Sequence, residues 1–204
     1  KDISLKTDDG WVDIGAVVRL APIKDVKTMI YAFFELHERL PKVRLHIMGG
    51  VDDEEYGAEC HALVETLGVR DLIFTGRVNV VEYMEKLDFT ILTSISEGQP
   101  LSVLESLAAC RPCVTTEVGC CRELLEGAPG DDFGVAGFVT PPMYRKGLAD
   151  AMERMCTSRA RRIEMGERGK RRVAKYFLHE QMLANYRALY DVTAQAFDLP
   201  REGE

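Results

Sequence analysis

The apolar residues of this chain change their spacing repeatedly, from short continuous runs to the spacing of amphipathic helices. Short apolar runs are typical of buried parallel strands, whereas helical spacing marks one apolar helix face. Strands are expected at 11–19, 43–48, 71–75, 88–93, 112–116 and 137–140. Helices are expected between them at 25–40, 53–67, 80–86, 100–110 and 120–126, then consecutively at 143–156, 158–176 and 179–197. The pattern predicts an α/β fold, with a Rossmann-like parallel sheet of about six strands, helices on both faces and a C-terminal helical extension.

The 204 residues are enough to bury one core without a disulfide or a metal. A net charge of −7 argues against a nucleic-acid partner. No apolar run approaches the roughly 20 residues of a membrane span. The polar segment Lys1–Gly10 does not begin with Met, and we expect it to be an interdomain linker remnant of a longer chain. Residues 11–177 would then form the Rossmann-like domain, and residues 178–204 a C-terminal helix.

The six cysteines are Cys60, Cys110, Cys113, Cys120, Cys121 and Cys156. We expect reduced thiols in the cytoplasm, because a chain of this size needs no disulfides and shows no secretion signal. Four of these cysteines could supply zinc ligands, but two adjacent cysteines share a tetrahedral site only with strain. The sequence therefore favours Cys110 at the end of a helix and Cys113 at the start of a buried strand, without a metal.

The loops that follow the strands are the places to look for a binding site, because ligands of parallel sheets bind outside the carboxyl ends of the strands. These loops are 20–24, 49–53, 76–79, 94–99 and 117–121. Neither a Gly-x-Gly-x-x-Gly dinucleotide motif nor a Gly-x4-Gly-Lys-Ser/Thr phosphate loop is present. Instead, Arg19 and Lys24 flank the first loop, where a guanidinium and an ammonium can bind phosphate oxygens. The alternative is a solvated loop that carries two charges.

The loop after the fourth expected strand leads through Glu97 into a helix that begins near Leu101. The first amides of this helix, those of Leu101 and Ser102, are free donors suited to a diphosphate. Glu105 shares their helix face, where its carboxylate can accept hydrogen bonds from a ribose diol. Glu97 precedes the helix, where a sugar beyond the diphosphate would lie. Alternatively, Glu105 only complements the helix dipole and Glu97 is an ordinary loop acid.

Taken together, Arg19, Lys24, Glu97 and Glu105 resemble the motif set of the retaining, nucleotide-sugar-dependent glycosyltransferases of family 4. These enzymes have the two-domain GT-B fold, and their donor-binding domain carries Gly-Arg-Leu-x-x-x-Lys followed by Glu-x7-Glu. The order of the four residues and the spacing of the two glutamates match that pattern. The resemblance implies that this chain is the C-terminal, donor-binding half of such an enzyme.

The likeness runs from Trp11 to about Tyr190 and includes 74–78, 106–116, 118–119, 123–124 and 137–141. The chain departs from the family at Val18, Asp25 and Cys110, where the family has glycine. Within the family, residues 19–28 and 93–97 most resemble the cytoplasmic glycosyltransferases of bacterial Pel exopolysaccharide synthesis, which use a UDP-sugar.

The resemblance also implies roles for individual residues. Arg19 and Lys24 would bind the donor diphosphate and stabilise charge on the departing UDP, so that no metal or other cofactor is expected. Glu97 would contact the hydroxyls of the donor sugar, which makes Glu97, Arg19 and Lys24 the expected catalytic residues, with no protein nucleophile. Glu105 would hold the ribose. The expected donor-binding set is completed by Arg77 near the uracil and by Gly98, Leu101 and Ser102 near the phosphates.

The expected partners are a UDP-sugar donor, a glycan acceptor and an N-terminal domain of the same chain. The final helix would pack on that domain through Met182, Leu183, Tyr186, Leu189, Tyr190 and Val192, and the fragment alone would bind nucleotide without transferring sugar. The preceding helices are basic at Arg159, Arg161, Arg162, Arg168, Lys170, Arg171, Arg172 and Lys175. This indicates a solvated face, or alternatively contact with the inner membrane or a polysaccharide-synthesis complex. A GT-B UDP-sugar epimerase and a non-catalytic scaffold module are the alternative functions.

Overall fold

The computed structural model describes residues 3–196, without the side chains of His179 and of residues 193–196. Six parallel strands form one sheet in the order β3-β2-β1-β4-β5-β6. The strands are β1 (Val12–Val17), β2 (Val43–Met48), β3 (Leu72–Gly76), β4 (Phe89–Leu92), β5 (Cys113–Thr116) and β6 (Gly137–Thr140). The predicted fold class and the six-stranded parallel sheet are therefore confirmed.

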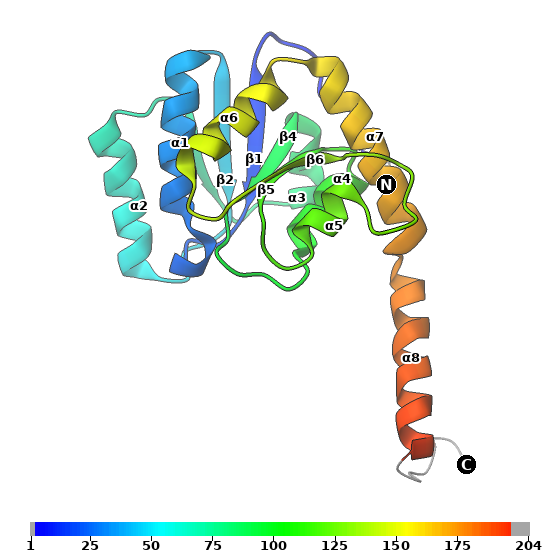
Figure 1. The fold of residues 1–204 in the computed structure, drawn as a ribbon. Coiled ribbons are helices and arrows are strands. Elements are labelled where there is room, and N and C mark those ends of the chain that lie inside the picture. Colours follow the sequence, from blue (N-terminus) through cyan, green and yellow to red (C-terminus); the bar gives the residue numbers. More distant parts are fainter. Residues whose placement is uncertain (1–2, 197–204) are drawn as a thin grey trace.

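Helices cover both faces of the sheet (Figure 1). They are α1 (Val26–Arg39), α2 (Glu54–Leu67), α3 (Val80–Tyr83), α4 (Leu101–Ala108), α5 (Cys121–Glu126), α6 (Arg145–Cys156), α7 (Arg159–Tyr176) and α8 (His179–Ala196). Helix α1 packs against α2 and α6, whereas α4 packs against α5 and α7. The helix predicted at 80–86 is divided into α3 and a 3-10 turn at Met84–Lys86. Phe197, the predicted end of the last helix, lies outside the described residues.

Side chains and backbone geometry set the helix ends. The Asp53 carboxylate accepts a hydrogen bond from the Tyr56 amide at 2.9 Å and begins α2, and Gly68, with φ of 62°, ends it. Helix α4 is shorter than the predicted 100–110. Pro100 lies before its first turn, and Cys110 is outside the helix because its φ of 59° is left-handed.

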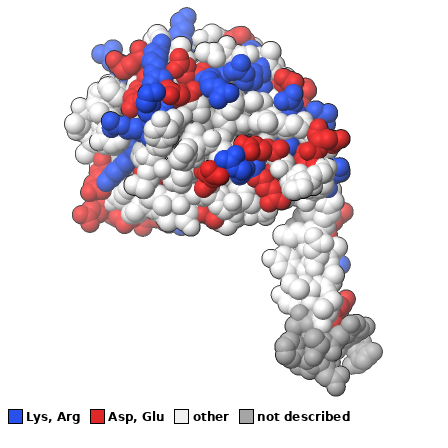
Figure 2. All heavy atoms as spheres, viewed as in Figure 1, with Lys and Arg blue, Asp and Glu red and all other residues white. Residues whose placement is uncertain are grey.

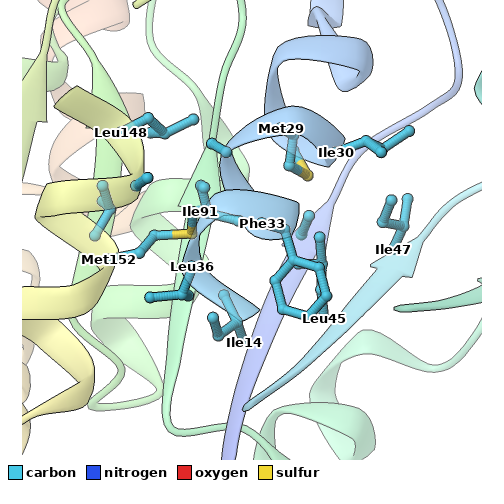
Figure 3. Close-up of a cluster of buried hydrophobic side chains, with 14 of the residues drawn as sticks. Ile14, Met29, Ile30, Phe33, Leu36, Leu45, Ile47, Ile91, Leu148 and Met152 are labelled. Carbon is cyan, nitrogen blue, oxygen red and sulfur yellow. The ribbon is translucent and has the colours of Figure 1, made fainter. Parts of the chain in front are cut away.

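The largest core cluster lies between β1, β2 and β4 on one side and α1 and α6 on the other. Ile14, Phe33, Leu36, Leu45 and Met152 are all fully buried there, and Figure 3 shows them interleaved between the strands and the two helices. Each large apolar side chain that is buried in this way stabilises a fold by about 1.5–3 kcal/mol. This cluster fixes the positions of the strands whose ends carry the candidate site.

The N-terminal residues lie against the amino end of the sheet. Lys6 Nζ is 2.8 Å from Asp13 Oδ2 and 3.4 Å from Asp88 Oδ2. Arg111 donates from one terminal nitrogen to the Ser4 carbonyl at 2.6 Å. Side-chain contacts therefore hold this part of the polar N-terminal segment against the strands.

Asp13 of β1 is the centre of a buried polar network. His46 Nε2 lies 2.9 Å from Asp13 Oδ1, and Arg44 donates from Nε to the same oxygen at 2.6 Å. Tyr83 completes the network with its hydroxyl 3.0 Å from His46 Nδ1. Burial opposes ionisation of Asp13, but the hydrogen bonds from His46, Arg44 and Lys6 outweigh it and hold its pKa well below the usual range.

The six cysteines are free thiols. Cys113 begins β5, as the sequence indicated, whereas Cys110 lies after α4 and not at its end. Burial raises the pKa of Cys113 and of Cys121 to about 11, so both are protonated at neutral pH. Among the described residues, no group of three or more His, Cys, Asp or Glu side chains could hold a metal ion.

Two of the arginines assigned to a basic surface of the C-terminal helices are in fact buried. Arg162 donates to the Met155 and Cys156 carbonyls and lies 3.2 Å from Asp88 Oδ1. Arg172 forms two hydrogen bonds with Asp131, at 2.6 and 3.1 Å. The predicted basic face is wrong at these two positions, because their positive charges satisfy carbonyl and carboxylate groups inside the domain. On the face shown in Figure 2, Lys and Arg side chains are interspersed with Asp and Glu.

Helix α8 extends away from the rest of the domain (Figure 1). The apolar side chains that the sequence placed on this helix are exposed, and they are Met182, Leu183, Tyr186, Leu189, Tyr190 and Val192. Figure 2 shows that much of the helix surface in view is uncharged. None of the described helices combines the length and the apolar character needed to cross a membrane.

Candidate functional site

The candidate site lies where the sheet order changes direction. From β1 the chain continues through β2 and β3 on one side, and through β4, β5 and β6 on the other. A crevice outside the carboxyl ends of the strands at such a switch point is the usual ligand site of an open α/β sheet. The loop after β1 carries Arg19 and Lys24, and the loop after β4 carries Glu97. The topology therefore brings three of the predicted site residues to one edge.

A cavity of 390 Å³ opens at this edge. This volume falls within the range of about 300–1,000 Å³ that is typical of small-molecule sites. The residues that line it come from the ends of β1, β2 and β3 and from the start of α3: Val17, Val18, Arg19, Lys24, Met48, Gly49, Gly50, Arg77, Val78 and Val80. Three cations, Arg19, Lys24 and Arg77, thus share one largely apolar cavity.

Lys24 and Glu97 form an ion pair that joins the loops after β1 and β4. Lys24 Nζ lies 2.6 Å from Glu97 Oε1, and the Ser94 hydroxyl donates to the same carboxylate oxygen, also at 2.6 Å. The two charged side chains are only 19% and 15% exposed. Partial burial strengthens their interaction relative to a pair on the surface.

Arg19 and Arg77 differ from Lys24 in their surroundings. The Arg19 side chain is 62% exposed and is paired with Asp52, from the loop after β2. Arg77 is exposed and lies over Gly50, where an added Cβ would come 3.0 Å from Arg77 Nε. Within residues 3–196, Arg77 makes no ion pair, so its charge is available to an anion in the cavity.

The predicted residues of α4 lie apart from this cavity lining. Leu101 and Glu105 occupy its exposed face one turn apart, and Ser102 is half-buried. The amides of Leu101 and Ser102 have no acceptor in the described part of the chain. Leu101 is 68% exposed and lines a separate groove of 510 Å³ between α4 and α8. Glu105 and these two amides are therefore open to a ligand but do not line the cavity that holds Arg19.

The 94–99 loop is held by close contacts with the loop after β5. The Thr116 hydroxyl donates to the Ser94 carbonyl at 2.7 Å, and the Cys120 amide donates to the Gly98 carbonyl at 3.0 Å. A Cβ on Gly119 would lie 2.1 Å from the Gly98 oxygen, so only glycine allows this approach. Contacts with Thr116, Gly119 and Cys120 thus fix the backbone that carries Glu97 and Gly98.

Two of the positions where the family has glycine are left-handed in this chain. Asp25 has φ of 45° and Cys110 has φ of 59°. A side chain in this conformation costs about 1–2 kcal/mol, which explains why glycine is suited to both positions. Asp25 offsets part of that cost, because its carboxylate accepts a hydrogen bond from the Thr28 amide at 3.3 Å and caps α1.

Sequence reasoning did not identify Ser94, Asp52 and Gly50 as parts of the site. All three lie in or beside loops that the sequence had marked as informative. The contacts of Asp52 with Arg19 and of Gly50 with Arg77 join separate strand ends, and such contacts have no local sequence signal. The hydrogen bond from Ser94 to Glu97 lies within one loop and depends on the conformation of that loop. Only the positions of these residues at the ends of β2 and β4 could have pointed to them.

The comparisons with known proteins identify the family of this chain and agree with its fold. The family described as "Glycosyl transferases group 1" matches residues 12–158, and the chain belongs to this family. N-acetyl-alpha-D-glucosaminyl L-malate synthase of Bacillus anthracis is 26% identical over 170 residues, which cover 82% of this chain and 42% of that protein. Alpha-monoglucosyldiacylglycerol synthase of Streptococcus pneumoniae is 31% identical over 114 residues, covering 54% and 25% respectively. This chain thus spans less than half the length of these curated relatives.

Solved structures show the same fold. Anabaena Alr3699/HepE, in complex with UDP and glucose, matches with a TM-score of 0.77 and 22% identity, over 87% of this chain and 48% of that one. A second match is the C-terminal domain of the glycosyl transferase group 1 family protein LpcC from Francisella tularensis, with a TM-score of 0.72 and 20% identity. It covers 82% of this chain and 87% of that one. These matches show that the chain shares its fold with one domain of these proteins.

Proposed function

We propose that this chain is the donor-binding domain of a retaining glycosyltransferase that takes a hexose-type sugar from UDP and transfers it to a growing polysaccharide or glycan. The observation that carries the proposal is the cavity at the sheet switch point. It holds Arg19, Lys24 and Arg77, with Glu97 in contact with Lys24. Arg19 and Lys24 in one cavity suit a diphosphate, and a neighbouring carboxylate suits the hydroxyls of a sugar.

In this proposal, Arg19 and Lys24 bind the diphosphate and stabilise the negative charge that develops on UDP as the glycosidic bond breaks. Positive side chains directed at the leaving group can supply the stabilisation that other enzymes obtain from a metal ion. We therefore propose a metal-independent reaction. Glu97 contacts the donor sugar through its carboxylate.

The remaining donor contacts come from the neighbouring elements. Arg77 lies beside the uracil, and the free amides of Leu101 and Ser102, together with Gly98, contact phosphate oxygens. Glu105 accepts hydrogen bonds from the ribose hydroxyls. The open face of α4 and its unpaired first amides support these roles, since helix N-termini favour anions.

The residues at 19–28 and 93–97 support a finer assignment to Pel-type bacterial exopolysaccharide synthesis. We propose that the enzyme acts in the cytoplasm, at the periphery of the inner membrane, within a polysaccharide-synthesis complex. An N-terminal domain would supply the acceptor site and contact the apolar face of α8. The chain alone would then bind UDP without transferring sugar.

Calorimetric titration of the chain with UDP, GDP and ADP tests this proposal. We expect UDP to bind most tightly, and Lys24→Ala and Glu105→Ala each to weaken its binding. Unchanged UDP affinity in both variants would contradict the assigned site. No thermal stabilisation by any of the three nucleotides would instead favour a scaffold role. Sugar turnover is then measured with a chain that includes the N-terminal domain.

A further inference from the structure

Ser94 is buried directly beneath the Glu97 carboxylate, and its own side chain is inaccessible to solvent. Its hydroxyl donates to Glu97 Oε1 at 2.6 Å, the oxygen that also accepts from Lys24. This leaves Glu97 Oε2 without a partner among the residues that the structure describes. One carboxylate oxygen is therefore held by the protein, and the other is available to a ligand.

The hydroxyls on either side of Ser94 hold the surrounding backbone. The Thr93 hydroxyl lies 2.9 Å from the Lys24 carbonyl and 3.1 Å from the Asp25 carbonyl. The Thr116 hydroxyl donates to the Ser94 carbonyl at 2.7 Å. Both threonines are buried, so these hydrogen bonds are shielded from water. Lys24, Ser94 and Glu97 are thus fixed relative to one another by three buried hydroxyl groups.

We propose that Ser94 is a positioning residue, which holds the Glu97 carboxylate against Lys24 and directs its second oxygen towards the donor sugar. This role rests on the proposed function, in which Glu97 contacts the sugar. Ser94 touches neither the diphosphate nor the sugar and acts only through Glu97. A site that is organised before the ligand arrives avoids the cost of ordering a long side chain on binding.

The first test needs no ligand and is a double-mutant cycle in urea with Ser94→Ala, Glu97→Gln and the double variant. We expect the double variant to lose clearly less stability than the sum of the single variants, because alanine removes the donor of the Ser94–Glu97 hydrogen bond and the neutral amide of glutamine weakens its acceptor. Additive losses would overturn the proposal. Ser106→Ala is the matched control, since Ser106 is a buried serine bonded to Thr90, and we expect it to be additive with Glu97→Gln.

The second test compares UDP with UDP-glucose and UDP-N-acetylglucosamine by calorimetry. We expect Ser94→Ala to weaken binding of the preferred UDP-sugar by about fivefold to tenfold, and to change the affinity for UDP by no more than about twofold. Ser94→Thr keeps the hydroxyl, and we expect it to restore the affinity for the UDP-sugar that Ser94→Ala loses. Equal losses for UDP and UDP-sugar, or no rescue by threonine, would overturn the positioning role.

Two outcomes separate this inference from the proposed function. Failure of the wild-type chain to bind UDP and both UDP-sugars contradicts the proposed function, whereas the urea cycle still decides whether Ser94 holds Glu97. Should Ser94→Ala fail to fold, Ser94→Cys carries the same predictions, because a thiol has a similar size but is a weak donor.

Discussion

Replacing Lys24 with methionine separates what this residue does for stability from what it does for binding. Lys24→Met keeps an unbranched apolar side chain but removes the ammonium that lies 2.6 Å from Glu97 Oε1. The Glu97 carboxylate, 15% exposed, then retains Ser94 as its donor but loses its counter-ion. Breaking a surface pair costs up to about 1 kcal/mol, and breaking a buried pair about 3–5 kcal/mol. For this half-buried pair we expect a loss of about 1–3 kcal/mol in the free energy of unfolding.

For a chain of this length, that loss lowers the melting temperature by about 2–12 °C. Adding Glu97→Gln to Lys24→Met removes the unpaired charge, so we expect it to restore much of the stability. We do not expect Glu97→Gln to restore UDP binding in the same way. Loss of a charge-assisted hydrogen bond to the diphosphate costs about 1.5–3 kcal/mol, which weakens binding about 10- to 150-fold, and Glu97→Gln does not restore it.

Thermal unfolding and UDP calorimetry on both variants measure the two effects separately. Lys27→Met is the matched control, because Lys27 lies three residues away and pairs with Glu59 at an exposed position. We expect this control to change neither quantity by more than about 0.5 kcal/mol. The reasoning is refuted if Lys24→Met binds UDP as the wild type does, or if the double variant is as unstable as the single one.

Three further changes test other parts of the structure. Asp52→Asn frees Arg19 from a surface ion pair worth at most about 1 kcal/mol. UDP should therefore bind up to about fivefold more tightly at low salt in calorimetry, with a smaller gain at high salt. Weaker UDP binding would contradict this expectation. Asp13 has a pKa below its unfolded value of about 3.9, so its carboxylate stabilises the fold above that pH, and this stabilisation is lost as the pH falls through the folded pKa. Urea unfolding should therefore show Asp13→Asn less stable than wild type by about 3 kcal/mol at pH 7, with the gap narrowing below pH 4, and a gap independent of pH would argue against the network. Gly119→Ala would place a Cβ 2.1 Å from the Gly98 oxygen and displace the backbone beside Glu97, so UDP-sugar binding should weaken about tenfold in calorimetry. Normal sugar binding in the folded variant would rule out that effect.

The regular elements of this fold could be predicted because their signals are local. Val43–Met48 and Gly137–Thr140 form strands with the predicted ends, since each run of apolar residues is bounded by turn residues. The predicted helix end at Cys110 was wrong, because Cys110 has a left-handed backbone and α4 ends before it. The helix predicted at 80–86 does end at Lys86, but it changes from α to 3-10 at Met84. Buried Arg162 was also beyond sequence reasoning, since an arginine at helical spacing usually faces water.

Part of the candidate site was predictable: Arg19, Lys24 and Arg77 line the cavity and Glu97 contacts Lys24, but the pairing of these residues could not be predicted. The order of strands and loops was enough to place Arg19 and Lys24 at the edge that also carries Glu97. The partner of Arg19, Asp52, comes from another strand end, whereas Ser94 lies in the same loop as Glu97, three residues before it. Such pairs depend on strand order and loop conformation, neither of which has a signature in a single sequence.

The pairing of Lys24 with Glu97, and of Arg19 with Asp52, has a consequence for the selectivity of the cavity. An anion that binds either cation competes with a carboxylate that is already paired with it. A small ion such as inorganic phosphate can replace one partner but cannot reach all the cations together. A long ligand with charge at one end and hydroxyl groups at the other can satisfy both the cations and the displaced carboxylates. The two carboxylates therefore weaken the attraction of Arg19 and Lys24 for the abundant simple anions of a cell.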